Sequence, residues 1–184
     1  MDEFDQPACV AALGTFDGVH LGHAALLRRA VTVAREHGLP AVALTFDRHP
    51  MALVNPEHVP MALIDEGEKA RLFEELGLDG MVIEPFTAEF AAQTGEEYLR
   101  ALANKLRPRV IVVGEDHRFG RGGKGDAALL RRMAPGLGYE AIVIPPVMMD
   151  GAPVSSTRIR QLLQKGDFSA AERLAGHALA RASC

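Results

Sequence analysis

The chain has 184 residues, of which 48% are hydrophobic and 24% charged. These proportions are typical of globular proteins and argue against disorder, collagen-like repeats and coiled coils. Twenty Lys and Arg residues against 24 Asp and Glu residues give a formal net charge of −4, which is too balanced for the uniformly basic surface of a nucleic-acid-binding protein. The length corresponds to one domain, and we expect a single domain over residues 1–184.

The cysteines and the N-terminus indicate where the protein works. Cys9 and Cys184 stand near opposite ends of the chain in no metal-ligand or redox spacing, so we expect no disulfide framework or zinc site. The first ten residues, MDEFDQPACV, begin acidic where a secretory signal begins basic. No apolar run approaches the roughly 18 residues of a membrane span. We therefore expect a cytoplasmic protein with neither a membrane nor a nucleic-acid partner.

Short runs of Val, Ile, Leu and Ala alternate with amphipathic segments. The runs are continuous, as in strands that are covered on both faces, and they span residues 8–13, 41–46, 80–86, 109–114 and 139–145. Apolar residues at helical spacing predict helices over residues 23–37, 66–76, 95–106, 126–137, 156–165 and 168–175. This alternation predicts a doubly wound α/β fold, with a mainly parallel sheet of about five strands and helices on both faces. Asp126 is the expected N-cap of its helix.

The first predicted strand ends in GTFDGVHLGH, residues 14–23. Ligands bind beyond the carboxyl ends of parallel strands, and the N–H groups at a helix N-terminus attract phosphate. Glycines let the backbone approach a ligand closely, and His20 and His23 are near enough to reach one anion. The motif predicts a phosphate site. A metal site built from Asp17, His20 and His23, or a glycine turn with incidental histidines, are the alternatives.

A second candidate site is VSSTRIR, residues 154–160. Ser155 or Ser156 as a helix N-cap explains a serine without any ligand. That reading does not explain three hydroxyl residues followed one turn later by Arg160, which is placed to hold phosphates at the helix N-terminus. Arg158 is expected to be a solvated surface charge. The pattern favours a second phosphate-binding helix end.

Two segments interrupt the alternation of strands and helices. Residues 47–65 contain three prolines and are longer than an ordinary connection, as functional loops often are. Residues 120–125, GRGGKG, do not stand where the dinucleotide-binding fingerprint belongs, and Gly125 replaces the Ser or Thr of a P-loop. The second segment is either a mobile surface turn or a basic flap that closes over phosphates.

The two motifs resemble the HxGH and [IV]SSTxxR signatures of the nucleotidyltransferase superfamily. TFDRHP (45–50), PFTAEFA (85–91), VVGEDHRFGRGGKGD (112–126) and GDFSAAERLAG (166–176) are similar to segments of prokaryotic FAD synthetase. That family is the FMN adenylyltransferase module of the bifunctional riboflavin kinase/FAD synthetase. The resemblance runs from about residue 10 to residue 176. It implies a Rossmann-like nucleotidyltransferase fold and transfer of the adenylyl group of ATP to the phosphate of FMN, giving FAD and pyrophosphate, with Mg²⁺.

The resemblance also implies roles for individual residues. Catalysis is assigned by family position to His20, His23, Asp116 and Arg160. ATP is expected to be held by the two histidines together with Gly14, Phe16, Asp17, Gly22, Ser156, Thr157 and Arg160. The flavin is expected to contact Phe46, Asp47, His49, Pro50, Tyr98 and Phe119. Mg²⁺ is expected to bind mainly through the ATP phosphates, with Asp116 as the protein group beside it.

The chain lacks the PTAN-type motif of the kinase that usually accompanies this module. We therefore expect no riboflavin kinase domain and a separate riboflavin kinase that supplies FMN. Two alternatives stay open for the function. The first is a nucleotidyltransferase of the same superfamily with another phosphate-bearing acceptor, such as glycerol phosphate, phosphopantetheine or nicotinamide mononucleotide. The second is a flavin- or nucleotide-binding module without catalysis.

Overall fold

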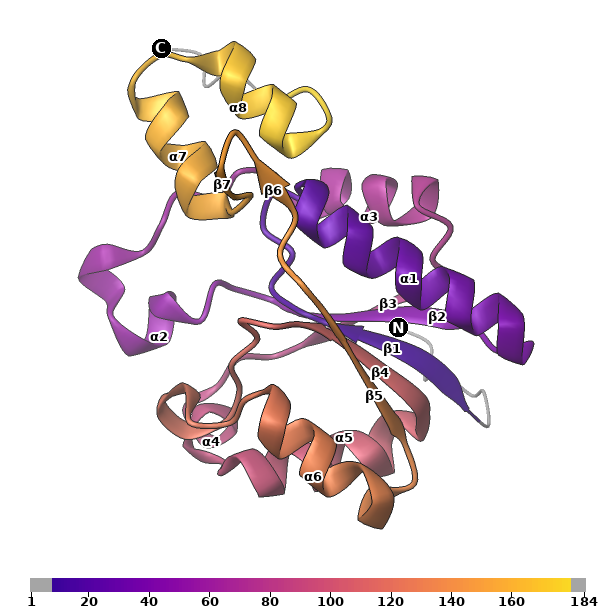
Figure 1. Cartoon of the computed structure of the whole chain (residues 1–184). Coiled ribbons are helices and arrows are strands. Elements are labelled where there is room, and N and C mark those ends of the chain that lie inside the picture. Colours follow the sequence, from indigo (N-terminus) through magenta and orange to yellow (C-terminus); the bar gives the residue numbers. More distant parts are fainter. Residues whose placement is uncertain (1–7, 180–184) are drawn as a thin grey trace.

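The computed structural model describes residues 8–179, so Cys184 lies outside the described residues (Figure 1). Five parallel strands form one sheet in the order β3-β2-β1-β4-β5. Their bounds are Cys9–Leu13 (β1), Ala41–Phe46 (β2), Gly80–Glu84 (β3), Pro108–Gly114 (β4) and Glu140–Ile144 (β5). All five predicted strands are present, and the predicted parallel α/β sheet is confirmed.

Helices cover both faces of this sheet, as the continuous apolar strands predict (Figure 1). Helices α1 (Leu21–His37) and α3 (Glu66–Glu75) pack with the sheet around one buried cluster, and α5 (Gly95–Leu106) and α6 (Ala127–Leu137) around another. Every residue of β1 is buried, because this central strand is covered on both sides. Its carboxyl end is therefore a rigid support for the turn that follows.

Local sequence signals set the helix ends. Asp65 accepts a hydrogen bond from the backbone N of Glu68 at 2.8 Å, and Asp126 accepts one from that of Leu129 at 2.9 Å. The predicted N-cap at Asp126 is thus confirmed. At the other end of α1, Gly38 adopts φ 63°, the left-handed conformation that terminates many helices.

Several short elements depart from the predicted alternation. The proline-containing loop holds α2 (Met51–Val54) and the 3₁₀ turn η1 (Pro56–His58), while α4 (Ala88–Ala92) precedes α5 and η2 (Arg121–Gly123) lies in the glycine-rich loop. A two-stranded hairpin, β6 (Met148–Met149) and β7 (Ala152–Pro153), leads into α7 (Ser156–Gln164) and α8 (Phe168–Ala175). None of the helices over residues 8–179 is long and apolar enough to cross a membrane.

The strand order predicts a crevice at the carboxyl ends of two central strands, β1 and β4. From β1 the chain moves to β2 and β3 on one side and later returns to β4 and β5 on the other. Connections leave in opposite directions at the carboxyl ends of β1 and β4, which is where open α/β sheets bind ligands. The α7–α8 pair lies beyond this end of the sheet (Figure 1), where Ile159 and Leu174 pack in a third buried cluster with Leu63.

Candidate active site

A cleft of about 800 Å³ opens at the carboxyl ends of β1 and β4. Many of the predicted site residues line it: Gly14, Phe16, His20, Gly22, His23, Phe46, Pro50, Tyr98, Asp116 and Phe119. An adjoining cavity of about 320 Å³ shares Thr15 and Phe46 with the cleft and is lined by Asp17, Asp47 and His49. Neither hollow is lined by Ser156, Thr157 or Arg160, although Ser155 lines the larger one.

His20 is the N-cap of α1, and the helix begins two residues before its predicted start at His23. Its Nδ1 accepts a hydrogen bond from the backbone N of His23 at 3.3 Å. Because Nδ1 is the acceptor, the ring proton resides on Nε2, which is left as a donor. Burial lowers the pKa of His20 to about 4, and the negative charges of Asp116 and Asp17 only partly oppose this. The ring is therefore neutral at pH 7.

His23 stacks on His20, with ring centroids 3.7 Å apart and planes 15° apart. The rings of His23 and Phe16 form an edge-to-face pair with centroids 5.4 Å apart. Burial lowers the pKa of His23 well below its usual value, and His20 and Lys69 lower it further. Its Nδ1 is buried and makes no hydrogen bond within the described part of the chain. Buried polar atoms usually have a partner, so this atom is an exception at the centre of the site.

The two lowered pKa values near 4, those of His20 and His117, predict a pH-dependent stability. Both groups have pKa values near 6.5 when unfolded, so the unfolded chain binds more protons below that pH. We expect the free energy of unfolding to be constant above pH 6.5 and to fall by about 1 kcal/mol per pH unit for each histidine as the pH drops toward 4. Urea unfolding at pH 7.5 and pH 5 measures this.

A variant of His117 is the control for this comparison of stability at pH 7.5 and pH 5. His117→Phe replaces one aromatic ring by another and removes one of the histidines with a lowered pKa, so its stability should depend less steeply on pH. At pH 5 most unfolded-state carboxylates are still ionised, which isolates the histidines. Equal free energies of unfolding for the native chain at pH 7.5 and 5 would show that these rings are not held neutral.

The turn that carries the histidines has unusual backbone geometry. Phe16 and Val19 adopt φ 49° and 36°, although neither is glycine, and Gly18 adopts φ 79°. A Cβ at Gly18 would lie 2.7 Å from the side chain of Leu63. Each such non-glycine residue costs about 1–3 kcal/mol and persists only when the surrounding structure enforces it. The turn is thus held in a shape that its own sequence does not favour.

Asp17 joins the two signature motifs. Its carboxylate accepts from the backbone N of Leu63 at 2.9 Å and forms an ion pair with the guanidinium of Arg160. Arg160 also donates from Nε to the carbonyl of Met61 at 2.8 Å, and the hydroxyl of Ser156 donates to the carbonyl of Asp17 at 2.8 Å. In this structure Arg160 therefore holds the first motif rather than an open phosphate site.

The hydroxyl and arginine residues of the second motif take separate roles. Ser155, not Ser156, is the N-cap of α7, since its hydroxyl accepts from the backbone N of Arg158 at 3.2 Å. Arg158 is not a solvated surface charge: it donates to the carbonyls of Met149 and Ala152 at 2.7 and 3.1 Å. That prediction was wrong because the β6–β7 hairpin, which the sequence pattern missed, brings these carbonyls to the guanidinium.

Among residues 8–179 there is no group of three or more His, Cys, Asp and Glu side chains that would hold a metal. Asp17 turns to Arg160 rather than toward the histidines, so the site does not support the alternative of a metal held by Asp17, His20 and His23. Asp116 lines the cleft and lies close enough to His20 to raise its pKa. Mg²⁺ is commonly held by one or two carboxylates plus substrate phosphates, and a single carboxylate suits that mode.

Aromatic rings form one wall of the cleft. Phe46 contacts Phe86 and Phe90 with centroid distances of 5.1 and 5.5 Å. The series continues to Tyr98 at 5.7 Å from Phe90 and to Phe119 at 5.4 Å from Tyr98. All five rings line the cleft. The predicted site residues omit Phe86 and Phe90, although the PFTAEFA segment contained the signal.

Asp47 and His49 shape the loop after β2 instead of facing the larger cleft. Asp47 accepts from the backbone N of Phe86 at 2.9 Å, and this hydrogen bond is the main reason that its pKa is lowered. The Nδ1 of His49 accepts from the backbone N of Met51 at 3.1 Å. These contacts position Phe46 and Pro50, which do line the cleft.

Lys69 of α3 is a site residue that sequence reasoning missed. Its ammonium donates to the carbonyl of Thr15 at 3.3 Å and lines the smaller cavity beside Asp17. Burial lowers its pKa, and the negative charges of Asp17 and Glu66 only partly oppose this. In sequence it stands on the polar side of an ordinary amphipathic helix, so nothing there marked it.

The glycine-rich loop at residues 120–125 packs against its surroundings. Phe119 and Gly125 form an antiparallel bridge, and a Cβ at Gly125 would lie 2.5 Å from the Phe119 ring. A Cβ at Gly120 would lie 2.6 Å from the backbone N of Gly95. The loop borders the cleft through Gly120, Gly122 and Gly123. The loop is therefore a packed border of the cleft, and its role as a basic flap stays a prediction.

The arrangement matches a known family over most of its length. The family model described as FAD synthetase matches residues 2–158. The chain belongs to the FAD synthetase family. A Geobacillus thermodenitrificans relative, whose provisional name is bifunctional riboflavin kinase/FMN adenylyltransferase, is 40% identical over 170 residues, covering 92% of this chain and 90% of that protein. The FAD synthetase of Listeria monocytogenes is 33% identical over 174 residues, covering 94% of this chain and 70% of that protein.

Other proteins that are similar to this chain are considerably longer. The bifunctional riboflavin kinase/FMN adenylyltransferase of Escherichia coli K12 is 34% identical over 181 residues, which are 98% of this chain and 58% of that protein. A solved structure from Streptococcus pneumoniae, which bears the name macrolide-efflux protein, superposes with a TM-score of 0.87 and 31% identity over 96% of this chain and 59% of that one. The chain thus spans somewhat more than half of these two proteins and shares the fold of the solved one.

Proposed function

We propose that this chain transfers the adenylyl group of ATP to the phosphate of FMN, giving FAD and pyrophosphate. One observation carries the proposal: a single cleft holds the stacked His20–His23 pair at the N-terminus of α1 and a wall of five aromatic rings. The first feature suits phosphate groups, and the second suits a flat heteroaromatic ring such as isoalloxazine. The names of the relatives support the same reaction.

The reaction needs positioning and charge stabilisation rather than a strong base. A phosphate monoester carries nearly two negative charges at pH 7, because its second pKa is about 6. An oxygen of the FMN phosphate can therefore attack the α-phosphorus of ATP without losing a proton. The bond from that phosphorus to the bridging oxygen breaks, and the electron pair leaves with pyrophosphate. Atoms and charges balance without a covalent enzyme intermediate.

The histidines would act as neutral donors in this step. His20 keeps its proton on Nε2 because Nδ1 accepts from the helix backbone, so it would donate to an oxygen on the α-phosphorus of the transferred adenylyl group. Fixed donors of this kind are effective because they need no reorganisation when charge develops. Mg²⁺, when bound with ATP, would neutralise charge on the triphosphate, and Asp116 is the protein group that we propose beside it.

The flavin would occupy the aromatic wall. Phe90 lies between Phe46 and Tyr98 in the series of rings, and its side chain is only half-buried. Phe90→Ala should weaken FMN binding about tenfold, since an aromatic contact contributes about 1 kcal/mol beyond the buried area. Titration of FMN fluorescence measures this, and ATP affinity in the same variant is the internal control. Equal losses of FMN and ATP affinity would show that Phe90 makes no specific contact with the flavin, and would contradict a flavin site at this wall.

The proposal is tested by incubating the protein with ATP, FMN and Mg²⁺ and separating the flavins by chromatography. FAD and pyrophosphate should appear in equal amounts. A second arm with riboflavin in place of FMN tests the proposed separate riboflavin kinase, since no FAD should form in it. Tight binding of ATP and FMN without turnover would instead favour the non-catalytic binding module.

A further inference from the structure

The strained turn of the first motif is held by side chains from several distant segments. The carbonyl of Thr15 accepts from the hydroxyl of Thr45 at 3.0 Å and from Lys69 at 3.3 Å. The carbonyl of Asp17 accepts from Ser156 at 2.8 Å. These contacts come from β2, α3 and α7. They show how the surrounding structure enforces positive φ values on Phe16 and Val19.

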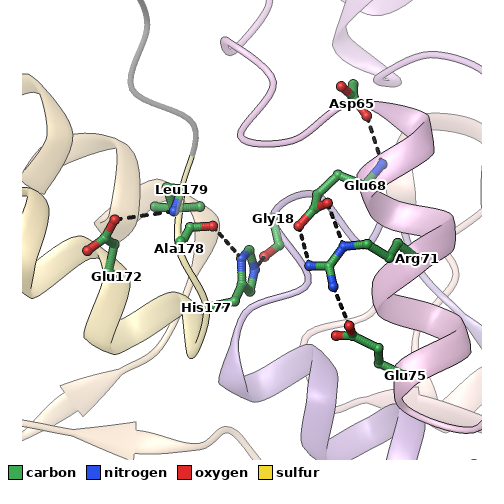
Figure 2. Close-up of polar contacts among 9 residues, drawn as sticks. All are labelled: Gly18, Asp65, Glu68, Arg71, Glu75, Glu172, His177, Ala178 and Leu179. Carbon is green, nitrogen blue, oxygen red and sulfur yellow. Dashed lines mark hydrogen bonds and ion pairs between the residues drawn. The ribbon is translucent and has the colours of Figure 1, made fainter.

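A further contact to this turn comes from the segment that follows α8. The Nε2 of His177, which follows α8, lies 2.8 Å from the carbonyl oxygen of Gly18 (Figure 2). Gly18 is buried and stands between the two non-glycine residues of positive φ. Its carbonyl belongs to the peptide group that joins Gly18 to Val19, in the turn just before His20. A hydrogen bond to this oxygen therefore fixes the orientation of that peptide group and of the backbone that leads to His20.

The ring of His177 is itself held in place. Its Nδ1 lies 2.8 Å from the carbonyl of Ala178, and the next residue, Leu179, is buried and donates from its backbone N to Glu172 at 3.4 Å. A Cβ at Gly176 would lie 2.6 Å from Leu21, the first residue of α1. The end of α8 is thus packed directly on the start of the helix that presents the histidines.

Charged groups of α3 face the same ring. Glu68 is gripped by Arg71 through hydrogen bonds of 2.8 and 2.6 Å, and Arg71 also binds Glu75 (Figure 2). The pKa of Glu68 is lowered chiefly by Arg71 and to a smaller extent by His177. The network thus places the carboxylate of Glu68 near the imidazole of His177.

We propose that His177 is a positioning residue for adenylyl transfer: it sets the geometry of the Phe16–Val19 turn by donating to the carbonyl of Gly18. The inference rests on the proposed function of this cleft. His177 lines neither hollow, so it acts through the turn and not on the substrates. A misplacement of about 1 Å in a positioned group is enough to lower a rate substantially.

Two amide variants separate this positioning role from ordinary packing, because each keeps a hydrogen-bonding group near only one of the two ring nitrogens. His177→Gln places an amide N–H near the position of Nε2 and keeps the contact to Gly18. His177→Asn places its amide near Nδ1 and keeps only the contact to Ala178. We expect His177→Asn to lower kcat for FAD formation about tenfold with little change in KM for FMN, and His177→Gln to retain nearly native kcat. Leu179→Ala, which loosens the same segment without touching the turn, should reduce thermal stability more than kcat.

A measurement without substrates tests the contact between His177 and Gly18 independently of FAD formation. Amide chemical shifts of residues 14–23, measured by NMR on the full chain, should move in His177→Asn and stay near native in His177→Gln. Equal kcat values and equal shifts in the two variants would overturn the positioning role, even if the native chain makes FAD. Shifts that differ as expected in a chain that makes no FAD would contradict the function and retain the contact.

Discussion

Replacing His23 by Ala is expected to lower kcat for FAD formation by about 10²- to 10³-fold, the usual effect of removing one charge-stabilising donor. His23 Nδ1 is buried without a partner among the described residues, so its loss leaves no other polar group unpaired. The lost contacts with His20 and Phe16 should lower stability without preventing folding, and far-ultraviolet circular dichroism and thermal unfolding are the controls. Steady-state kinetics with ATP and FMN give the result, and a native kcat in a folded variant would remove His23 from the mechanism.

His20 needs a different substitution, because it also caps α1. Asn is among the most favourable N-cap residues, so His20→Asn keeps the cap and removes the Nε2 donor. We expect near-native stability and a similar loss of kcat. His20→Ala should lose both properties, with about 1 kcal/mol of stability attributable to the cap. A native rate in His20→Asn would mean that this ring only caps the helix.

Breaking the ion pair between Asp17 and Arg160 should produce the largest loss of stability. Their side chains are 13% and 14% exposed, and removing one partner of a buried pair leaves an uncompensated charge that costs about 3–5 kcal/mol. Asp17→Asn is the cleanest change, because the amide oxygen can still accept from the backbone N of Leu63. Urea unfolding at pH 7 measures the difference.

A double-mutant cycle assigns this loss to the pair. Asp17→Asn combined with Arg160→Met removes both charges at similar volume. The double variant should therefore lose less free energy of unfolding than the two single variants lose together, by about 1–3 kcal/mol. Additive losses would show that the two residues act independently. Arg160 also donates to the carbonyl of Met61. Replacing Arg160 should therefore also loosen the segment around Met61.

Strands and long helices were predictable because their signals are local. Continuous apolar runs and helical periodicity depend on neighbouring residues, and all five strands of the sheet follow from them. Predictions were weaker where the determining contact is distant. Residue spacing placed Arg160 one turn into its helix, but its partner Asp17 is 143 positions away in sequence. Arg158 was misjudged for the same reason, since its carbonyl partners belong to an unpredicted hairpin.

The candidate site shows the same division between local and distant information. Both histidines were predicted from their motif, yet the capping role of His20 became apparent only from the position where α1 begins. The roles of Lys69 and His177 depend on the tertiary approach of α3 and of the segment after α8 to the turn. No local pattern in the sequence distinguishes such residues from solvated side chains.

The central claim is that the α-phosphorus of ATP ends up in FAD, and a labelling experiment tests it most directly. The protein is incubated with Mg²⁺ and ATP labelled at the α-phosphorus, with FMN, glycerol phosphate, phosphopantetheine and nicotinamide mononucleotide in separate reactions. We predict that label appears in FAD in the FMN reaction, in equal amount to unlabelled pyrophosphate, and in no product with the other acceptors. Transfer to one of those acceptors and not to FMN, or no transfer by folded protein, would contradict the account.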